Sequence, residues 1–152
     1  MDLTIEPARP EHANVLTQIA VSAKRRWDYP ERWIELWLPA LTISPNYISK
    51  HETWMAVNDE KPLGFYSLNK EDDSLWLDNL WILPEFMGQG IGSRLFHHAL
   101  ERSKALGASI LKIESDPNAQ SFYEKMGARK IGEHQSEVDG QARILPVMEI
   151  SL

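Results

Sequence analysis

The chain of 152 residues contains no cysteine. It therefore cannot form disulfides, bind a metal through thiolates or use a cysteine nucleophile. It also lacks any apolar run approaching the ~20 residues that cross a bilayer as a helix, and residues 1–3 do not open a signal peptide. From these absences we expect a cytoplasmic protein with no membrane partner.

Positive charge is scarce as well. The chain has 16 lysines and arginines against 22 aspartates and glutamates, a formal net charge of −6. This balance argues against a general nucleic-acid or anionic-membrane binder. It does not exclude a phosphate ligand, because local backbone amides can hold one whatever the global charge. No internal repeat or linker interrupts the chain, and its length suits a single domain over residues 1–152.

One stretch carries the strongest local signal. Residues 75–83 form an apolar run interrupted only by Asp78 and Asn79, which predicts a strand buried on both faces. A glycine-rich turn at residues 88–92 follows, and then an amphipathic helix that ends at Gly107. The apolar side of that helix holds Ile91, Leu95, Phe96, Ala99, Leu100 and Leu106. A strand, a glycine turn and a helix N-terminus can hold phosphate, because free amides and the helix dipole face the ligand.

A second local pattern lies at residues 115–128. Asp116 is placed as a helix N-cap, Pro117 as the first helical residue and Gly127 just past the helix end. The inward face of this helix holds Ala119, Phe122, Tyr123 and Met126. Taken alone, this pattern is typical of a helix that packs an aromatic side chain, Tyr123, in the core. The glycine turn at residues 88–92, taken alone, matches neither the dinucleotide-binding fingerprint nor a Walker loop.

The remaining elements follow from hydrophobic periodicity and turn residues. We expect strands at residues 3–7, 53–57, 63–68, 109–114, 128–136 and 144–150, and helices from residue 10 and over 31–38. The strand at 109–114 follows a crossing helix and should run parallel to the central strand. Asp139 and Gly140 mark a hairpin turn, and Pro146 indicates an edge position or irregular pairing. Residues 43–51 predict no element.

Together the two patterns resemble the GCN5-related N-acetyltransferase (GNAT) family. Met87-Gly88-Gln89-Gly90-Ile91-Gly92 matches the family's acyl-CoA loop, Arg/Gln-x-x-Gly-x-Gly/Ala, except that Met87 replaces Arg or Gln. Residues 116–128 match the family's Asn-x-x-Ala-x-x-Phe-Tyr-x-x-x-Gly-Phe, except at Asp116 and Ala128. The resemblance spans residues 1–152. It implies an α/β (α+β) fold: a mixed, mostly antiparallel sheet of about six or seven strands with a central splayed parallel pair, flanked by about four helices.

The resemblance also implies a co-substrate and a mechanism. Acetyl-CoA would be bound without a metal, and an amine would attack the thioester directly. The amide of Leu80 would polarise the thioester carbonyl, and Tyr123 would protonate the departing CoA thiolate. The residues assigned to acetyl-CoA are Leu80, Trp81, Ile82, Met87, Gly88, Gln89, Gly90, Ile91, Gly92, Ser93, Asp116, Phe122 and Tyr123.

The general base is less defined. Asp78 and Asn79 are polar residues in an apolar strand, and a buried polar group costs about 1–3 kcal/mol unless it is paired. They are therefore either paired structurally or in contact with substrate, and we name both as catalytic candidates. Glu114 and His51 are lesser candidates, and a water relay without a dedicated base is also open.

The acceptor amine is the remaining question. An aromatic wall with nearby carboxylates suits a small or amino-acid-like amine, and a peptide amine is also open. The predicted substrate-binding residues are Trp27, Tyr29, Trp33 and Asp78. Trp33 and Trp37 share a helical face and fit either this wall or the core, whereas the basic run at 24–26 fits a solvated helix end.

Two functions therefore remain. The first is an N-acetyltransferase that moves an acetyl group from acetyl-CoA to a primary amine of a small molecule or peptide. The alternative is a non-catalytic acyl-CoA-binding or sensing domain, which would need no Tyr123. Dimers are common in the family, so a homodimer is open, and we expect no nucleic-acid partner.

Overall fold

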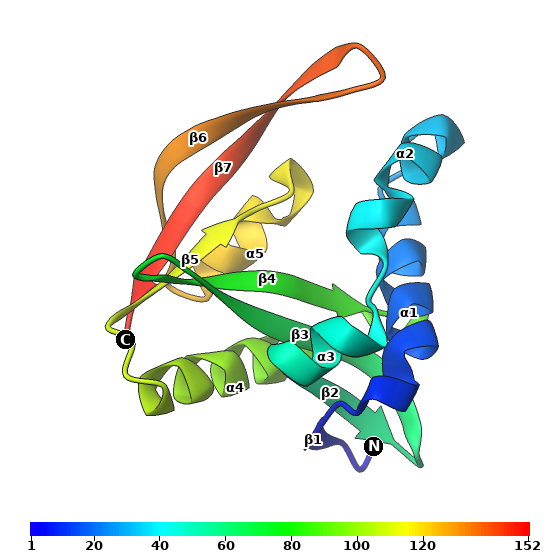
Figure 1. Cartoon of the computed structure of the whole chain (residues 1–152), viewed down its shortest axis with the longest axis vertical. Coiled ribbons are helices and arrows are strands. Elements are labelled where there is room, and N and C mark those ends of the chain that lie inside the picture. The colour runs from blue at the N-terminus through cyan, green and yellow to red at the C-terminus, as the bar shows by residue number, and fades with distance from the viewer.

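Seven strands form one mixed sheet in the order β1-β2-β3-β4-β5-β7-β6 (Figure 1). The computed structural model describes all residues, 1–152. The strands are β1 (Thr4–Pro7), β2 (Glu52–Asn58), β3 (Lys61–Glu71), β4 (Ser74–Ile82), β5 (Ile110–Glu114), β6 (Arg129–Val138) and β7 (Gln141–Ser151). The helices are α1 (Ala13–Arg25), α2 (Glu31–Leu41), α3 (Pro45–Lys50), α4 (Ile91–Ala105) and α5 (Gln120–Lys125), with short 3-10 turns at Pro10–His12, Pro84–Phe86 and Pro117–Ala119.

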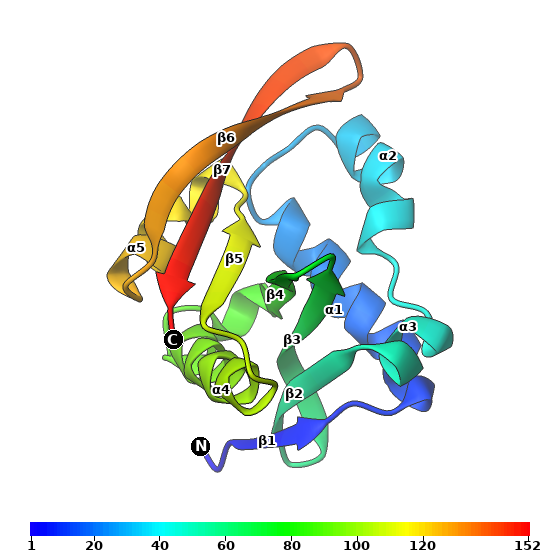
Figure 2. The ribbon, with the colours of Figure 1, turned by 60° about the vertical axis from the view of Figure 1, so that its left-hand side comes forward.

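Helices cover both faces of the sheet. On one face α4 and α5 bury a core that includes Leu95, Phe96 and Tyr123. On the other face α1 and α3 bury a second core that includes Leu16 and Ile48. Figure 2 shows α4 and α1 on opposite sides of the strands β2, β3 and β4. The predicted fold class is confirmed, with seven strands, one parallel pair and five helices where about four were expected.

The parallel pair β4–β5 is short. Leu75 to Leu77 pair with Leu111 to Ile113, and β4 then continues to Ile82 with no partner on that side. The predicted burial of β4 on both faces is therefore wrong, because only Leu77 and Ile82 are buried. Where the two strands separate, the backbone and side chains of β4 border an opening.

A β-bulge occurs at this point of separation. On β3, Ser67 pairs with Asn79 and Leu68 pairs with Leu77, so Asp78 is an extra residue with no partner. Bulges re-aim side chains and are over-represented next to active sites. Here the bulge breaks the alternation of β4, so that Leu77 and Leu80 both pack toward the α4 core.

Two helices differ from expectation. Helix α2 continues through Pro39 to Leu41 because Leu41 is buried, and the Thr42 N–H and hydroxyl both donate to the Leu38 carbonyl. Helix α3 was not predicted; its N-cap is Ser44, whose hydroxyl accepts from the Tyr47 N–H at 3.0 Å. None of the helices is both long and apolar enough to cross a membrane.

The β6–β7 hairpin is longer than predicted. Its turn places Asp139 and Gly140 at φ 50° and 76°, the left-handed pair that a two-residue hairpin loop requires. Of the two alternatives for Pro146, the edge position is wrong because β7 lies between β5 and β6. Irregular pairing is found next to it, because the register of β6 shifts between Lys130 and Gly132, opposite Met148 and Val147. Pro146 is tolerated there because it sits just beyond the end of β5, where its carbonyl accepts from the Ser115 N–H at 2.8 Å.

Candidate active site

A cavity of about 450 Å³ lies where β4 and β5 separate. It is bordered by β4, the glycine turn, the end of α1, the tip of β5 and α5. Its lining residues are Ala23, Arg26, Trp27, Leu77, Asp78, Asn79, Leu80, Trp81, Ile82, Phe86, Met87, Gly88, Gly90, Gly92, Ser93, Glu114, Asp116, Asn118, Ala119, Phe122 and Tyr123. Of the residues predicted for acetyl-CoA, all but Gln89 and Ile91 line this cavity.

The backbone of β4 turns polar groups toward the opening. The Leu83 N–H donates to the Leu63 carbonyl of β3 at 2.8 Å. In an antiparallel ladder, hydrogen-bonded pairs alternate with non-hydrogen-bonded pairs. Trp81, two residues before Leu83, therefore also bonds to β3 through its backbone. Leu80 and Ile82 direct their backbone N–H and C=O groups away from β3. On that side β5 has already diverged. These backbone groups are therefore available to a ligand.

The glycine turn forms a row of free donors. None of the amides of residues 88–93 donates to a protein acceptor, and they lead directly into α4 at Ile91. Gly88 and Gly90 have φ values of 78° and 84°, and a Cβ on either would project into open space. A helix N-terminus with this geometry favours an anion. Arg26, which forms no ion pair, also lines the cavity.

Tyr123 presents its hydroxyl to the cavity. The ring is buried between Phe96 and Phe122. The hydroxyl forms no hydrogen bond with another residue. Its oxygen is not fully enclosed by protein atoms, and Tyr123 lines the cavity, so the oxygen is accessible from there. Burial, with a smaller contribution from the charge of Asp116, raises the pKa of Tyr123. The hydroxyl is therefore protonated at neutral pH and available as a proton donor.

The polar residues of β4 have partners. The Asn79 amide donates to the Ser67 hydroxyl at 2.9 Å, and its carbonyl accepts from the Trp81 indole at 2.9 Å. The Asp78 carboxylate accepts from the Tyr47 hydroxyl of α3 and forms no ion pair. Asn79 thus has a protein partner for both its NH2 group and its carbonyl, whereas Asp78 is exposed at the cavity.

The two lesser candidates differ in position. Glu114 lines the cavity and pairs with His134 at 3.1 Å. His51 does not line it; its ring stacks on Tyr47 with centroids 4.1 Å apart. His51 instead borders a second cavity of about 590 Å³ at the opposite ends of β4 and β5, next to Ser74 and Ser109.

Asp116 is the centre of a buried charged cluster. Its carboxylate lies 2.6 Å from the Lys24 ammonium and 3.6 Å from the Arg143 guanidinium. Tyr29 donates to it at 3.0 Å, and the Asn118 N–H donates at 2.9 Å. Burial opposes ionisation of Asp116, but Lys24 and the donated hydrogen bonds together lower its pKa. The expectation that the basic run at 24–26 is solvated is wrong for Lys24, whose side chain is only 10% exposed.

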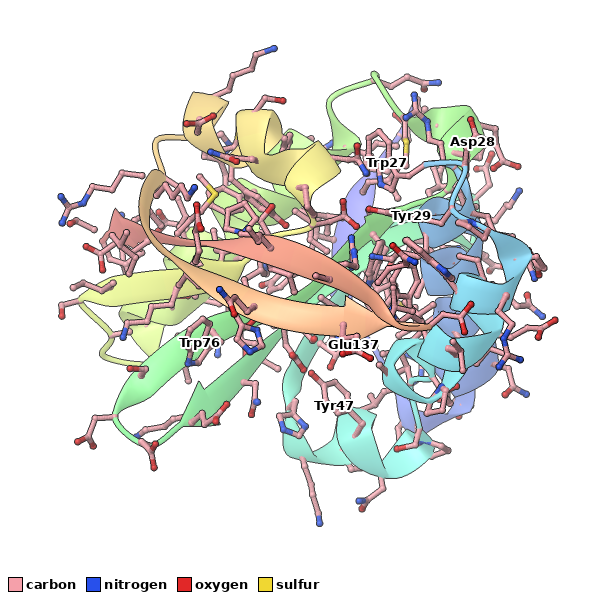
Figure 3. All side chains as sticks on the ribbon, turned by 90° about the horizontal axis from the view of Figure 1, so that it is seen from above. Trp27, Asp28, Tyr29, Tyr47, Trp76 and Glu137 are labelled. Carbon is pink, nitrogen blue, oxygen red and sulfur yellow. The ribbon has the colours of Figure 1, made fainter.

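The predicted substrate-binding aromatics fall into two groups. Trp27 lines the cavity, next to Arg26, whereas Tyr29 and Trp33 do not. Tyr29 stacks with Trp33, and its hydroxyl donates to Asp116. Burial and the nearby charge of Asp116 raise the pKa of Tyr29 to about 12. Figure 3 shows Trp27, Asp28 and Tyr29 together in the segment after α1. Trp37 belongs to the same cluster, with the Lys24 ammonium 4.3 Å from its ring centroid.

Sequence reasoning did not identify the partners of these residues. Tyr47, Ser67, Lys24 and Arg26 were not assigned to the site, and only a proline after a serine, Ser44-Pro45, signalled the helix that carries Tyr47. No group of three or more His, Cys, Asp or Glu side chains is arranged to hold a metal ion.

Comparison with known proteins gives consistent matches. The sequence profile of the acetyltransferase (GNAT) family matches residues 18–128. A peptidyl-lysine N-acetyltransferase, YjaB of Salmonella typhimurium, is 34% identical over 106 residues, which are 69% of this chain and 68% of that protein. A GCN5-related N-acetyltransferase from Rhodopseudomonas palustris superposes with a TM-score of 0.85 at 26% identity, over 100% of this chain and 97% of that one. PaiA N-acetyltransferase from Thermoplasma acidophilum, solved with coenzyme A, gives 0.80 at 21% identity over the full length of both chains.

Proposed function

The chain belongs to the acetyltransferase (GNAT) family and is an acyl-CoA-dependent N-acetyltransferase, and we propose that it moves the acetyl group of acetyl-CoA onto the side-chain amine of a lysine in a peptide or protein. The amine attacks the thioester directly in a ternary complex, with no acyl-enzyme. The observation that carries the proposal is Tyr123, an unpartnered hydroxyl at the cavity where β4 and β5 separate. A domain that only bound acyl-CoA would not need this group.

Acetyl-CoA would lie along the opening between the two strands. The free amides of residues 88–93 would receive the pyrophosphate, assisted by the N-terminus of α4. Met87 supplies no charge at this point, and we assign the missing positive charge to Arg26 at the rim of the cavity. The pantetheine amides would bond to the backbone groups that Leu80 and Ile82 turn away from β3.

The chemistry follows from these positions. The acceptor nitrogen attacks the thioester carbon, and the Leu80 N–H stabilises the negative charge that develops on the carbonyl oxygen. As the carbon–sulfur bond breaks, Tyr123 gives its proton to the CoA thiolate. The lysine ammonium first loses one proton to water, which frees the lone pair for attack, and Asp78 accepts the second proton as the carbon–nitrogen bond forms. Asn79, which is paired to Ser67 and Trp81, supports β4 rather than the reacting atoms.

Two observations support a peptidyl lysine as the acceptor. YjaB, 34% identical, is named a peptidyl-lysine N-acetyltransferase. In addition, Tyr29 and Trp33 pack into the Asp116 cluster and do not enclose a small pocket on the acceptor side. A long side chain can therefore enter while the rest of its peptide stays outside, and Asp78 and Glu114 can attract its ammonium.

The acceptor can be tested with a matched pair of peptides. One has a blocked N-terminus and a single internal lysine; the other has a free N-terminus and arginine in place of that lysine. We expect CoA release and acetylated product only with the first, by a thiol assay and peptide mass spectrometry. Acetylation of only the second peptide, or of small amines alone, would show that the acceptor assignment is wrong.

A further inference from the structure

A chain of four hydrogen bonds ends on Asp78. The Trp81 indole N–H bonds to the Asn79 carbonyl oxygen at 2.9 Å, and the Asn79 amide bonds to the Ser67 hydroxyl at 2.9 Å. Ser67 lies 2.9 Å from the Tyr47 hydroxyl, which in turn bonds to Asp78 Oδ2. The chain joins β4, β3 and α3 and returns to β4. Both of its ends lie at the cavity, because Trp81 and Asp78 line it.

Chemistry fixes the direction of every bond in this chain. An indole can only donate, and a carboxylate can only accept. Because the Tyr47 hydroxyl donates to Asp78, Ser67 must donate its own proton to the Tyr47 oxygen, and its lone pair receives the Asn79 amide. All four protons therefore point toward the carboxylate. A side-chain network anchored on a buried residue, here Ser67, restricts its members to one geometry.

The chain holds one oxygen of Asp78 and leaves the other free. Only Oδ2 has a hydrogen-bond partner, and no cation pairs with the carboxylate. Asp78 is the extra residue of the β-bulge, at the point where β5 leaves β4. Figure 3 shows Tyr47 on α3, beneath the β6–β7 hairpin. The Tyr47 ring stacks on His51, and its hydroxyl bonds to Ser67, so two contacts fix the position of the hydroxyl.

Building on the proposed function, we propose that Tyr47 is a positioning residue for the reaction, with Ser67 behind it. Tyr47 holds Asp78 Oδ2 so that Oδ1 faces the acceptor nitrogen. A proton moves from that nitrogen to Oδ1 as the carbon–nitrogen bond forms, while Tyr123 gives a separate proton to the CoA sulfur as the carbon–sulfur bond breaks. Asp78 then releases its proton to water and Tyr123 regains one from water, so each turnover leaves the protein unchanged.

Glu114 does not fit this role as well. Its carboxylate is paired with His134, both side chains are about half exposed, and nothing buried fixes either one. Asp78, in contrast, is connected through Tyr47 to Ser67, which is fully buried. Accurate placement of a proton acceptor matters, because misplacement by about 1 Å can cost 10²-fold in rate.

The test is Tyr47→Phe, which removes the hydroxyl and keeps the ring on His51. We expect kcat with a lysine peptide to fall about tenfold or more, with the KM for acetyl-CoA unchanged. Tyr66→Phe is the matched control, because it also removes one tyrosine hydroxyl, but Tyr66 lies on β3 and its hydroxyl bonds to His98 rather than to this chain. Its kcat should stay within about twofold of the unmodified protein.

A double-mutant cycle shows whether Tyr47 acts through Asp78. We expect Asp78→Asn to lower kcat by about 10²-fold, and adding Tyr47→Phe to that variant should lower it no further. Multiplying effects would overturn the inference, because they would mean that the two residues act independently. Ser67→Ala breaks the same chain with every ring in place. It should also lower kcat, and it provides the test if Tyr47→Phe does not fold.

Failure of the proposed function can be distinguished from failure of the inference about Tyr47. If the unmodified protein acetylates no lysine peptide, the acceptor assignment is wrong and the inference falls with it. If the unmodified protein is active and Tyr47→Phe matches Tyr66→Phe in kcat, only the inference is overturned.

Discussion

At position 116 an aspartate stands where the family signature has asparagine, and its carboxylate is paired with Lys24, Arg143 and Tyr29. This cluster joins the segment after β5 to the end of α1 and to β7, and the first two of these border the cavity. Lys24 is buried against Trp37, and burial, only partly offset by Asp116, lowers its pKa. The ammonium therefore depends on Asp116 as its counter-charge.

Asp116→Asn should destabilise the fold. Removing one partner of a buried ion pair leaves the other charge uncompensated, at a cost of about 3 kcal/mol. Glu133→Gln is the matched control, because Lys130–Glu133 has the same 2.6 Å separation but is about half exposed. It should cost about 0–1 kcal/mol. Equal losses in denaturant unfolding of the two variants would contradict a buried role for Asp116.

The pH dependence of that loss has a defined sign. The pKa of Asp116 in the folded protein lies below its ordinary value of 3.8, so its contribution to stability is present above about pH 4. The contribution disappears as the pH falls through the lowered folded pKa. The difference in unfolding free energy between the unmodified protein and Asp116→Asn should therefore be full near pH 7 and shrink below about pH 4.

Tyr123→Phe separates a proton donor from a core residue. The variant keeps the ring between Phe96 and Phe122 and removes a hydroxyl that has no protein partner. Stability and acetyl-CoA affinity should therefore be unchanged, while kcat falls by about 10²-fold, as for loss of a general acid. Steady-state rates and a thermal melt of the same sample provide the measurement. An unchanged kcat would mean that another group protonates the thiolate.

At the scale of elements, the junction of β4, the glycine turn and α4 defines the cofactor site. Gly90 has φ 84° and is the N-cap of α4, with open space where a Cβ would lie. The same residue therefore serves the backbone conformation and the approach of a ligand. The bulge leaves Asp78 without a pairing partner on β3, and its carboxylate lies at the opening. The short pairing of β5 leaves the backbone of β4 after Leu77 without a partner on that side.

Gly90→Val should abolish tight acetyl-CoA binding. A branched side chain would occupy the space next to the free amides, and we expect affinity to fall at least about tenfold in calorimetry. Gly107→Val is the matched control, because Gly107 has φ 87° and equally open surroundings but lies at the other end of α4. Both variants should lose about 1–2 kcal/mol of stability from left-handed strain. Equal acetyl-CoA affinities in the two would contradict the role of the turn.

At the scale of the whole molecule, the sequence predicted what depends on local pattern. The glycine turn, the helix of Tyr123, the parallel strand at Ile110–Glu114 and the Asp139-Gly140 turn are each specified by neighbouring residues. The relation between distant segments was not predictable in the same way. Lys24 and Asp116 are 92 residues apart, and Tyr47 and Asp78 are 31 apart.

The features that the sequence did not predict also depend on contacts between distant segments. Lys24 in isolation is typical of a solvated helix end, and only burial against Trp37 and pairing with Asp116 make it a core residue. Pro39 normally ends a helix, but burial of Leu41 holds the last turn of α2. The bulge at Asp78 arises from register with β3, which a single strand does not reveal.

A crystal structure of the complex with acetyl-CoA tests the central claim most directly. The account predicts pyrophosphate oxygens within hydrogen-bond distance of the amides of residues 88–93, the thioester against the Leu80 N–H, and the sulfur next to the Tyr123 hydroxyl. The ligand should occupy the 450 Å³ cavity between β4 and β5. Acetyl-CoA seated instead in the 590 Å³ cavity beside Ser74 and Ser109, or with its pyrophosphate away from the turn, would contradict the account.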